Sequence, residues 1–188
     1  MKLILCSQSP RRREILGMLG VPFEVRVANI DEAIDQSKPI ASEIKGLAKK
    51  KALAIEMKED EVLLSFDTVV CDGSLVMGKP KDRDEAIKML QGYSGKGHGV
   101  ITGICVRTKD KLYTDSEYTM VYFRELTNTE IEHYVDSYKP YDKAGGYGIQ
   151  ELAGSFVKKI DGDFYNVVGL PLCRLCEILK KELSIDLF

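Results

Sequence analysis

The stretch LILCSQSPRRREIL, residues 3–16, begins with an apolar segment and continues into a strongly basic one. Its first four residues, Leu3 to Cys6, predict a buried strand. Ser9 followed by Pro10 is typical of a helix N-terminus, because serine caps the first turn and proline fits its first position. We therefore expect a strand, a short turn and a helix that ends near Gly20.

The rest of the chain alternates between apolar strand patterns and helical patterns, and this predicts an α/β fold with a mixed sheet and flanking helices. Further strands are expected at residues 22–30, 62–72, 98–108 and 111–126, the last two antiparallel. Further helices are expected at 42–57, at 84–90, after a capping box at 127–130 and after Pro171. A hairpin is expected around Asp161-Gly162. The chain has no repeats or linkers, so residues 1–188 are expected to form a single domain.

Composition limits the classes of function. Hydrophobic residues make up 44% of the 188 and charged residues 30%, which excludes a disordered or fibrous chain. Because 27 Lys and Arg face 29 Asp and Glu, no nucleic-acid partner is expected. Basic residues nevertheless gather at 11–13, 49–51 and 79–81, which suits a small polyanion better than a long one, with solvated surface runs as the open alternative.

Several chemistries are excluded by their missing residue patterns. No run approaches the ~18 apolar residues of a membrane span, and the opening MKLIL is too short for a signal peptide, so a cytoplasmic protein without a membrane partner is expected. The five cysteines do not form a disulfide framework. Cys173 and Cys176 are expected to be buried in the last helix. His98 and His133 have no partners at zinc-ligand spacing, and His133 is expected on an exposed helix face.

The turn before the first helix is a candidate anion site. Ser7 and Ser9 flank this turn, and the unpaired amides of a helix N-terminus attract negative charge. Helical periodicity turns Arg12, and partly Arg11, toward the protein body, whereas Arg13 faces away. The inward arginines are expected to bind phosphate, although pairing with carboxylates at the edge of the core is the alternative.

A lysine occupies the apolar face of the helix expected at 42–57. Lys51 lies in the middle of an apolar stripe, while its neighbours Lys49 and Lys50 lie on the polar sides. Such a lysine either extends past the apolar surface into solvent or meets an anion at a cleft. The stripe is formed by Ile44, Leu47, Ala48 and Ile55.

A carboxylate interrupts the apolar strand LLSFDTVV. Asp67 must be paired, bind a metal or act as a base, or else be a hydrogen-bonded aspartate near a strand end. Lys79 follows on a turn, and Glu32 supplies a second carboxylate. Magnesium uses such oxygen-rich sites when phosphates complete its coordination shell. Together with the basic groups, this assembly suits metal-assisted attack of water at phosphorus, without identifying the base.

Several motifs resemble the Maf (septum formation inhibitor) family of nucleoside triphosphate pyrophosphatases over nearly the whole chain. They are SQSPRRREIL from Ser7, the pair Asp31-Glu32, LAKKKALAI around Lys51, FDTVV around Asp67, MGKPKD around Lys79, SGKGHGVITG from Ser94, DKAGGYGIQELAG from Asp142 and NVVGLPL from Asn166. The resemblance implies a fold like that of inosine triphosphate pyrophosphatases (Maf/Ham1), with two lobes around a cleft. It also implies hydrolysis of a small-molecule nucleoside triphosphate to the monophosphate and diphosphate with Mg²⁺ or Mn²⁺.

The resemblance also assigns roles to residues. Asp67 matches the proposed proton acceptor and, with Glu32, the metal site. The phosphate and metal site is implied to include Ser9, Arg12, Glu32, Lys51 and Lys79, with Ser7 added from the turn. Arg11, Thr68 and Gln150 match the positions that distinguish dTTP and UTP hydrolysis from hydrolysis of 7-methyl-GTP. A glutamine amide offers both a donor and an acceptor to a uracil-like edge.

The chain departs from the family pattern at two places. Ser65-Phe66 precedes Asp67 where small residues are usual, and this bulk is expected to narrow the cleft. Gly97 and Gly99 flank His98 where larger residues are frequent. Modified pyrimidine triphosphates therefore stay open as substrates. A nucleotide-binding regulator of cell division that acts through a partner is the alternative function, and similar proteins are often homodimers.

Overall fold

The structure, a computed structural model, describes residues 1–185 and is built on a seven-stranded mixed sheet. The strands follow the order β2-β1-β3-β5-β6-β7, and β4 pairs with β3 off this path. The β1–β2 and β1–β3 pairs are parallel, and the other pairs are antiparallel. The strands are β1 (Lys2–Leu5), β2 (Phe23–Val25), β3 (Glu61–Asp72), β4 (Leu75–Met77), β5 (Gly97–Arg107), β6 (Leu112–Phe123) and β7 (Val157–Asp161). The expected mixed-sheet α/β class is confirmed.

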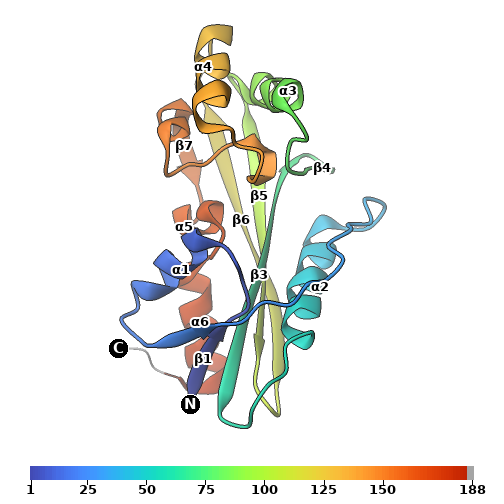
Figure 1. The fold of residues 1–188 in the computed structure, drawn as a ribbon, viewed down its shortest axis with the longest axis vertical. Coiled ribbons are helices and arrows are strands. Elements are labelled where there is room, and N and C mark those ends of the chain that lie inside the picture. Colours follow the sequence, from blue (N-terminus) through green and yellow to red (C-terminus); the bar gives the residue numbers. More distant parts are fainter. Residues whose placement is uncertain (186–188) are drawn as a thin grey trace.

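Helices cover both faces of this sheet, as Figure 1 shows. Helix α2 packs against β3 and β5 on one face, while α1 and α6 lie on the other and α3 and α4 gather at one end. The helices are α1 (Pro10–Gly17), α2 (Ile40–Leu53), α3 (Arg83–Tyr93), α4 (Asn128–Tyr138), α5 (Phe164–Val168) and α6 (Leu172–Leu183), with 3₁₀ turns η1 (Ala144–Gly146) and η2 (Leu152–Phe156).

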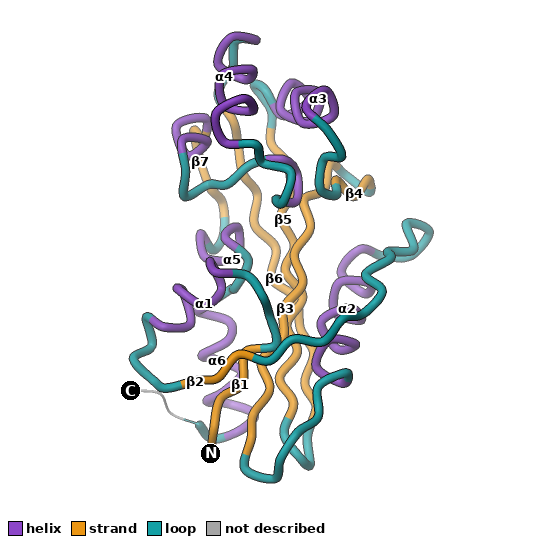
Figure 2. Tube along the Cα trace, in the orientation of Figure 1, coloured by secondary structure: helices purple, strands orange, loops and turns teal. Residues whose placement is uncertain are grey.

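The three long strands β3, β5 and β6 connect the two ends of the molecule (Figure 2). Along β3 the side chains alternate between the faces, as strand geometry requires. Leu64, Phe66 and Val70 join the large core that α1, α6, α3 and α4 cover. Val69 and Cys71 instead join the smaller core beneath α2.

Strand β3 is longer than the strands that pair with its outer edge. Strand β1 pairs with residues 61–64 of β3, and β4 pairs with residues 70–72. Within the described residues, no strand pairs with 65–69 on this side, although β5 pairs with all of them on the other. This part of β3 is therefore an open edge inside an otherwise continuous sheet.

Local sequence signals placed most elements correctly. Ser9 caps α1, with its hydroxyl accepting from the backbone N–H of Arg12, although the helix ends at Gly17 instead of near Gly20. The capping box of α4 at Thr127 and Glu130 is confirmed. The second strand is shorter than expected, because the chain leaves the edge of β1 after Val25. Strand β4 was not anticipated.

Two expectations were wrong. No hairpin forms at Asp161-Gly162, because Asp163 caps α5 directly after β7. Cys173 is exposed and Cys176 half-buried, because Leu175, Ile178 and Leu179 form the buried face of α6. His133 is exposed on α4, as expected.

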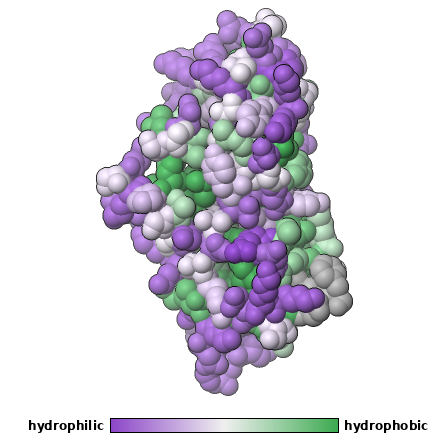
Figure 3. All heavy atoms as spheres, turned by 180° about the vertical axis from the view of Figure 1, so that it is seen from behind, coloured by the Kyte–Doolittle hydropathy of each residue, from purple (hydrophilic) through white to green (hydrophobic). Residues whose placement is uncertain are grey.

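The rear face of the molecule is largely hydrophilic, with apolar atoms gathered mainly near its middle (Figure 3). Among the apolar side chains exposed anywhere on the molecule are Leu75 and Tyr118. Among residues 1–185, none of the helices combines the length and the apolar character that crossing a membrane would need.

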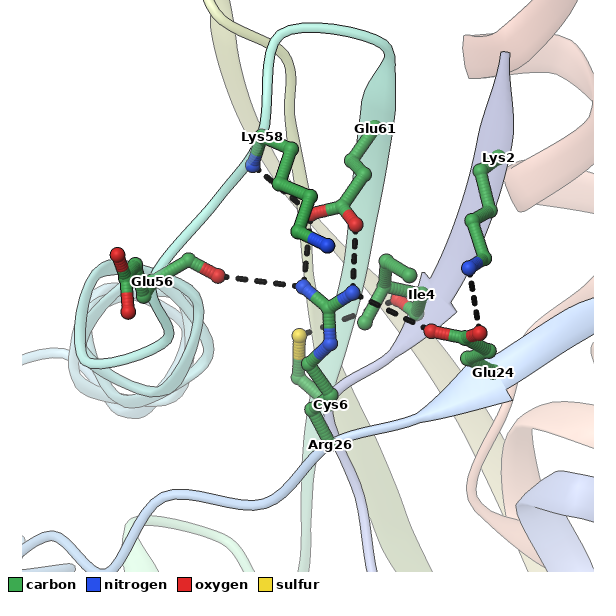
Figure 4. A network of polar contacts seen from close by, with 8 residues as sticks. All are labelled: Lys2, Ile4, Cys6, Glu24, Arg26, Glu56, Lys58 and Glu61. Atoms are coloured by element: carbon green, nitrogen blue, oxygen red, sulfur yellow. Dashed lines mark hydrogen bonds and ion pairs between the residues drawn. The ribbon is translucent and has the colours of Figure 1, made fainter.

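An ion pair between the half-buried Arg26 and the buried Glu61 joins the end of β2 to β3. The guanidinium of Arg26 donates to both carboxylate oxygens of Glu61, at 2.5 and 2.7 Å, and to the carbonyl of Glu56 at 3.3 Å (Figure 4). Glu61 is almost fully buried, and Lys58 also donates its backbone N–H to it. The hydrogen bonds from Arg26 lower the pKa of Glu61 to about 2. The ion pair thereby fixes the start of the segment that runs from β2 toward the open edge of β3.

This ion pair predicts how stability depends on pH. Because the pKa of Glu61 is lowered from 4.5 on folding, its contribution is complete above pH 4.5 and is lost as the pH falls toward 2. Glu61→Gln should therefore be less stable than the wild type at pH 7, and the difference should shrink between pH 4.5 and 2. Urea denaturation at stepped pH measures this. The control is Glu59→Gln at an exposed position, and an equal pH profile for Glu61→Gln and the wild type would refute the assignment.

Candidate functional site

A cleft of about 680 Å³ opens at the unpaired edge of β3. Its wall is drawn from segments that lie far apart in the sequence, from Cys6 to Gly169. Every residue that the sequence analysis assigned to a site lies in this wall. These residues are Ser7, Ser9, Arg11, Arg12, Glu32, Lys51, Asp67, Thr68, Lys79 and Gln150.

Arg12 is held at the start of α1 by three acceptors. Its Nε donates to the carbonyl of Gly169 at 2.7 Å, its Nη1 to Ser7 Oγ at 3.2 Å and its Nη2 to Thr68 Oγ1 at 2.9 Å. A guanidinium has five N–H groups, so one remains on each Nη. Arg12 is thus oriented by the protein and still offers a pair of donors.

A chain of hydroxyl groups holds Thr68, one of the three acceptors of Arg12, in place. Thr68 Oγ1 lies 2.9 Å from Thr102 Oγ1, and Thr102 donates to the carbonyl of Asn166 at 3.1 Å. With the proton of Thr102 on the carbonyl of Asn166, the Thr68 hydroxyl accepts from Arg12 and has two acceptors for its own proton, Thr102 Oγ1 and the carbonyl of Gly169 at 3.5 Å. Thr102 and Asn166 are fully buried, so this arrangement is shielded from water.

The opposite face of β3 carries an ion-paired cluster. Lys51 Nζ contacts Asp67 Oδ1 and lies 2.9 Å from Glu32 Oε1. The Lys51 side chain is 13% exposed and reaches the cleft from the buried face of α2. The expectation that Lys51 points inward is therefore confirmed. Of the two alternatives for this lysine, the structure shows the one in which it meets anions at a cleft.

Positive charge surrounds Glu32. Burial opposes its ionisation, but the hydrogen bond from Lys51 and the charges of Lys51, Lys79 and Arg12 outweigh burial and lower the pKa of Glu32. For Arg12, burial lowers the pKa, while the charges of Asp67 and Glu32 act against this change. The basic surrounding of the cleft therefore favours the ionised form of Glu32.

The two carboxylates have the character of a magnesium site. Glu32 and Asp67 both place an oxygen on the same ammonium group, so they converge on one cationic point. Mg²⁺ is held by one or two carboxylates, with water and phosphate oxygens as its other ligands. Among residues 1–185 no cluster of three or more His, Cys, Asp or Glu side chains could hold a metal ion. These residues fit Mg²⁺ or Mn²⁺ when water and substrate oxygens supply the remaining ligands.

A second ionic network holds the glycine-rich loop. Lys143, which is almost fully buried, binds Asp142 at 2.9 Å and Glu151 at 3.3 Å, and Asp142 lies 3.7 Å from Arg11. Burial alone would raise the pKa of Asp142, but Lys143 and Arg11 lower it. The network joins α1 to the loop that carries Gln150, whose side chain is exposed in the cleft wall.

His98 lies outside the cleft wall but contacts a residue within it. Its Nε2 is 2.7 Å from the hydroxyl of Tyr147, and both rings sit in an aromatic cluster with Tyr93 and Phe123. Burial lowers the pKa of His98 to about 4. A neutral histidine at this place supports Tyr147 through their hydrogen bond.

The departures from the family pattern lie away from the cleft. Ser65 and Phe66 are fully buried and do not line it, so the expected narrowing is not found. Gly97 and Gly99 also lie outside the wall. A Cβ atom at either glycine would come within 2.8 Å of a tyrosine ring, from Tyr122 or Tyr118.

Sequence reasoning missed two glycines that shape the site. Gly169 has a φ of 117° and ends α5, and its carbonyl holds Arg12. A glycine before Leu170-Pro171 is a helix-stop signal that could have located this cap. Gly103 pairs with Asp67 across the sheet, and a Cβ there would lie 2.3 Å from the carbonyl oxygen of Ile44. Its missing side chain lets α2 approach closely enough for Lys51 to reach Asp67.

Comparison with known proteins identifies the family of this chain. A model of the Maf-like protein family matches residues 2–182. A dTTP/UTP pyrophosphatase of Thermosipho africanus is 47% identical over 188 residues, covering 99% of this chain and 96% of that protein. The chain belongs to the Maf family. A dTTP/UTP pyrophosphatase of Thermoanaerobacter sp. (strain X514) is 44% identical over 191 residues, and the match covers 100% of this chain and 100% of that protein.

Solved structures of similar shape are more distant. A nucleoside-triphosphatase / dITP/XTP pyrophosphatase from Mycobacterium abscessus has a TM-score of 0.45 and 11% sequence identity. The match covers 67% of this Maf chain and 76% of the other chain.

The close contact at Gly103 predicts a sharp effect of one methyl group. Gly103→Ala should push α2 away from β5, cost about 1–3 kcal/mol of unfolding free energy and weaken the Lys51–Asp67 pair. Urea denaturation measures the loss. Gly46→Ala, in α2 itself, is the control. Its added Cβ meets nothing within 4 Å, so the variant should raise the free energy of unfolding by up to about 1 kcal/mol. Wild-type stability in Gly103→Ala would contradict the role given to this glycine.

Proposed function

We propose that this chain hydrolyses dTTP and UTP to the corresponding monophosphate and diphosphate. The observation that carries the proposal is the convergence of Arg12, Lys51 and Lys79 with Asp67 in one cleft. Basic groups of this kind bind the triphosphate, and a carboxylate beside them can accept a proton from water. The names of the Maf relatives support the choice of substrate.

The phosphate chain is proposed to lie along the N-terminus of α1. The two free N–H groups of Arg12 form a pair that suits two phosphate oxygens. Ser7 and Ser9 line the same turn, and the first amides of α1 add favourable electrostatics. Lys79 approaches from the loop after β4 and completes the basic surface.

Asp67 is proposed to activate the attacking water. Its carboxylate lies at the open edge of β3, where it accepts a proton as the bond between the α-phosphorus and the leaving diphosphate breaks. Lys51 and Arg12 stabilise the charge that builds up on the phosphate oxygens. When bound, a divalent cation held by Glu32 and Asp67 supplies further neutralisation of phosphate charge.

The base is proposed to be read by Arg11, Thr68 and Gln150. The amide of Gln150 can accept from N3–H of a uracil ring and donate to its O4. Arg11 is oriented by Asp142 and lies next to the same loop. Cytosine reverses the donor and acceptor of this edge, so it is the natural test of discrimination.

The organisation of the chain and its location are part of this proposal. Residues 1–188 are proposed to act as one catalytic domain, because the cleft takes residues from Ser7 to Gly169. All five cysteines are free thiols, which supports a reducing compartment such as the cytoplasm.

A substrate panel tests the reaction. With Mg²⁺, the wild type should convert dTTP and UTP to monophosphate and diphosphate, and Asp67→Asn should lower kcat by about 10²–10⁴-fold because it removes the base. Product chromatography and circular dichroism measure turnover and folding. Asp72→Asn, at the exposed end of the same strand, should keep full activity. Release of orthophosphate, or full activity of Asp67→Asn, would refute the mechanism.

A second variant tests base recognition. Gln150→Leu should lower kcat/KM for UTP by roughly tenfold and change that for CTP less, because one donor and one acceptor are lost at similar volume. Steady-state kinetics with both nucleotides give the ratio. Gln36→Leu, in the exposed loop before α2, is the control and should leave the ratio unchanged. An unaltered UTP to CTP ratio in Gln150→Leu would remove this residue from base selection.

A further inference from the structure

Lys51 occupies the point on which Glu32 and Asp67 converge. Its ammonium contacts Asp67 Oδ1 and lies 2.9 Å from Glu32 Oε1, and its side chain extends from the side of α2 that carries the buried Leu47, Ala48 and Ala52. The side chains of Lys51 and Asp67 are 13% and 11% exposed, so theirs is not a loosely held surface pair, whereas Glu32 reaches Lys51 from the solvent side with 55% of its side chain exposed. A lysine ammonium is a compact point charge that can exchange one anionic partner for another.

The same two oxygens cannot serve Lys51 and a divalent cation together. Mg²⁺ binds carboxylate oxygens at about 2.0–2.1 Å, which would place it beside the ammonium that already contacts both groups. Like charges this close repel by several kcal/mol in a partly buried site. Lys51 must therefore leave at least one carboxylate before the cation gains both.

We infer that Lys51 is an internal competitor for the metal site, and that nucleotide phosphates release the site by attracting Lys51. The second half of this inference rests on the proposed function. Glu32 and Asp67 then bind a divalent cation weakly when no nucleotide is present and more tightly when a triphosphate offers Lys51 a new partner. The device couples cation binding to substrate binding through one side chain.

Manganese binding without nucleotide tests the competition directly. Free Mn²⁺ is measured by electron paramagnetic resonance in titrations of the wild type and of Lys51→Met. Lys51→Met should bind Mn²⁺ at least about tenfold more tightly, because it removes the competing charge and leaves the two carboxylates unpaired. The double variant Lys51→Met/Glu32→Gln should lose this gain.

Two further measurements guard against misfolding as an explanation. Lys50→Met, exposed on the polar side of the same helix, is the matched control and should bind Mn²⁺ like the wild type. Thermal unfolding with and without Mn²⁺ should show a larger rise in Tm for Lys51→Met than for the wild type. Equal or weaker Mn²⁺ binding by a folded Lys51→Met would overturn the inference.

A Mn²⁺ titration with a nucleotide analogue present distinguishes failure of this inference from failure of the proposed function. With an α,β-imido analogue of dUTP, which resists hydrolysis between the α- and β-phosphates, the wild type should bind Mn²⁺ at least about tenfold more tightly than without it. Lys51→Met should show a clearly smaller gain. If the analogue enhances Mn²⁺ binding equally in both proteins, coupling through Lys51 is wrong. If the wild type fails to hydrolyse dTTP and UTP while Lys51→Met still binds Mn²⁺ more tightly, the proposed function fails and the competition stands.

Discussion

The site depends on a mismatch in strand length. Strand β3 has 12 residues, whereas β1 has four and β4 has three, and neither reaches residues 65–69. Because β5 pairs with this segment on the other side, the open edge keeps the regular geometry of a sheet. Its residues 67 and 68 point to opposite faces, yet both reach the same opening. A rigid edge thus presents two kinds of chemistry from adjacent positions.

Helices on the two faces of the sheet each bring a basic side chain to this edge, but to different residues of β3. Helix α2 brings Lys51 to Asp67, and Gly103 permits that close approach. Helix α1 brings Arg12 to Thr68, and its cap at Ser9 fixes where the helix begins. The strand therefore separates a carboxylate side from a hydroxyl side. A ligand that spans the opening contacts both, which suits a molecule with an anionic tail and a polar head.

The sequence predicted what is encoded locally. Helical periodicity turned Lys51 inward, and the Ser9-Pro10 pair located the start of α1, because each signal lies within a few residues. The partner of Arg12, Gly169, lies 157 residues away, and no local pattern indicates such a contact. The open edge of β3 follows from pairing between distant strands. The wrong hairpin at Asp161-Gly162 has the same origin, since a turn signal does not say whether a strand or a helix follows.

The three acceptors of Arg12 show how binding and folding are joined in this protein. Gly169 and Thr68 come from distant segments and Ser7 from the turn before α1, so the guanidinium joins these parts of the fold around the cleft while two of its N–H groups remain for a ligand. Thr68 is shared, because its hydroxyl accepts from Arg12 and belongs to the chain that ends at Asn166. Under the proposed function, a change at Thr68 is expected to affect both phosphate binding through Arg12 and recognition of the base. In the proposed reaction, base selection and phosphate binding are therefore coupled, because the Arg12–Thr68 hydrogen bond joins the residue proposed for one to the residue proposed for the other.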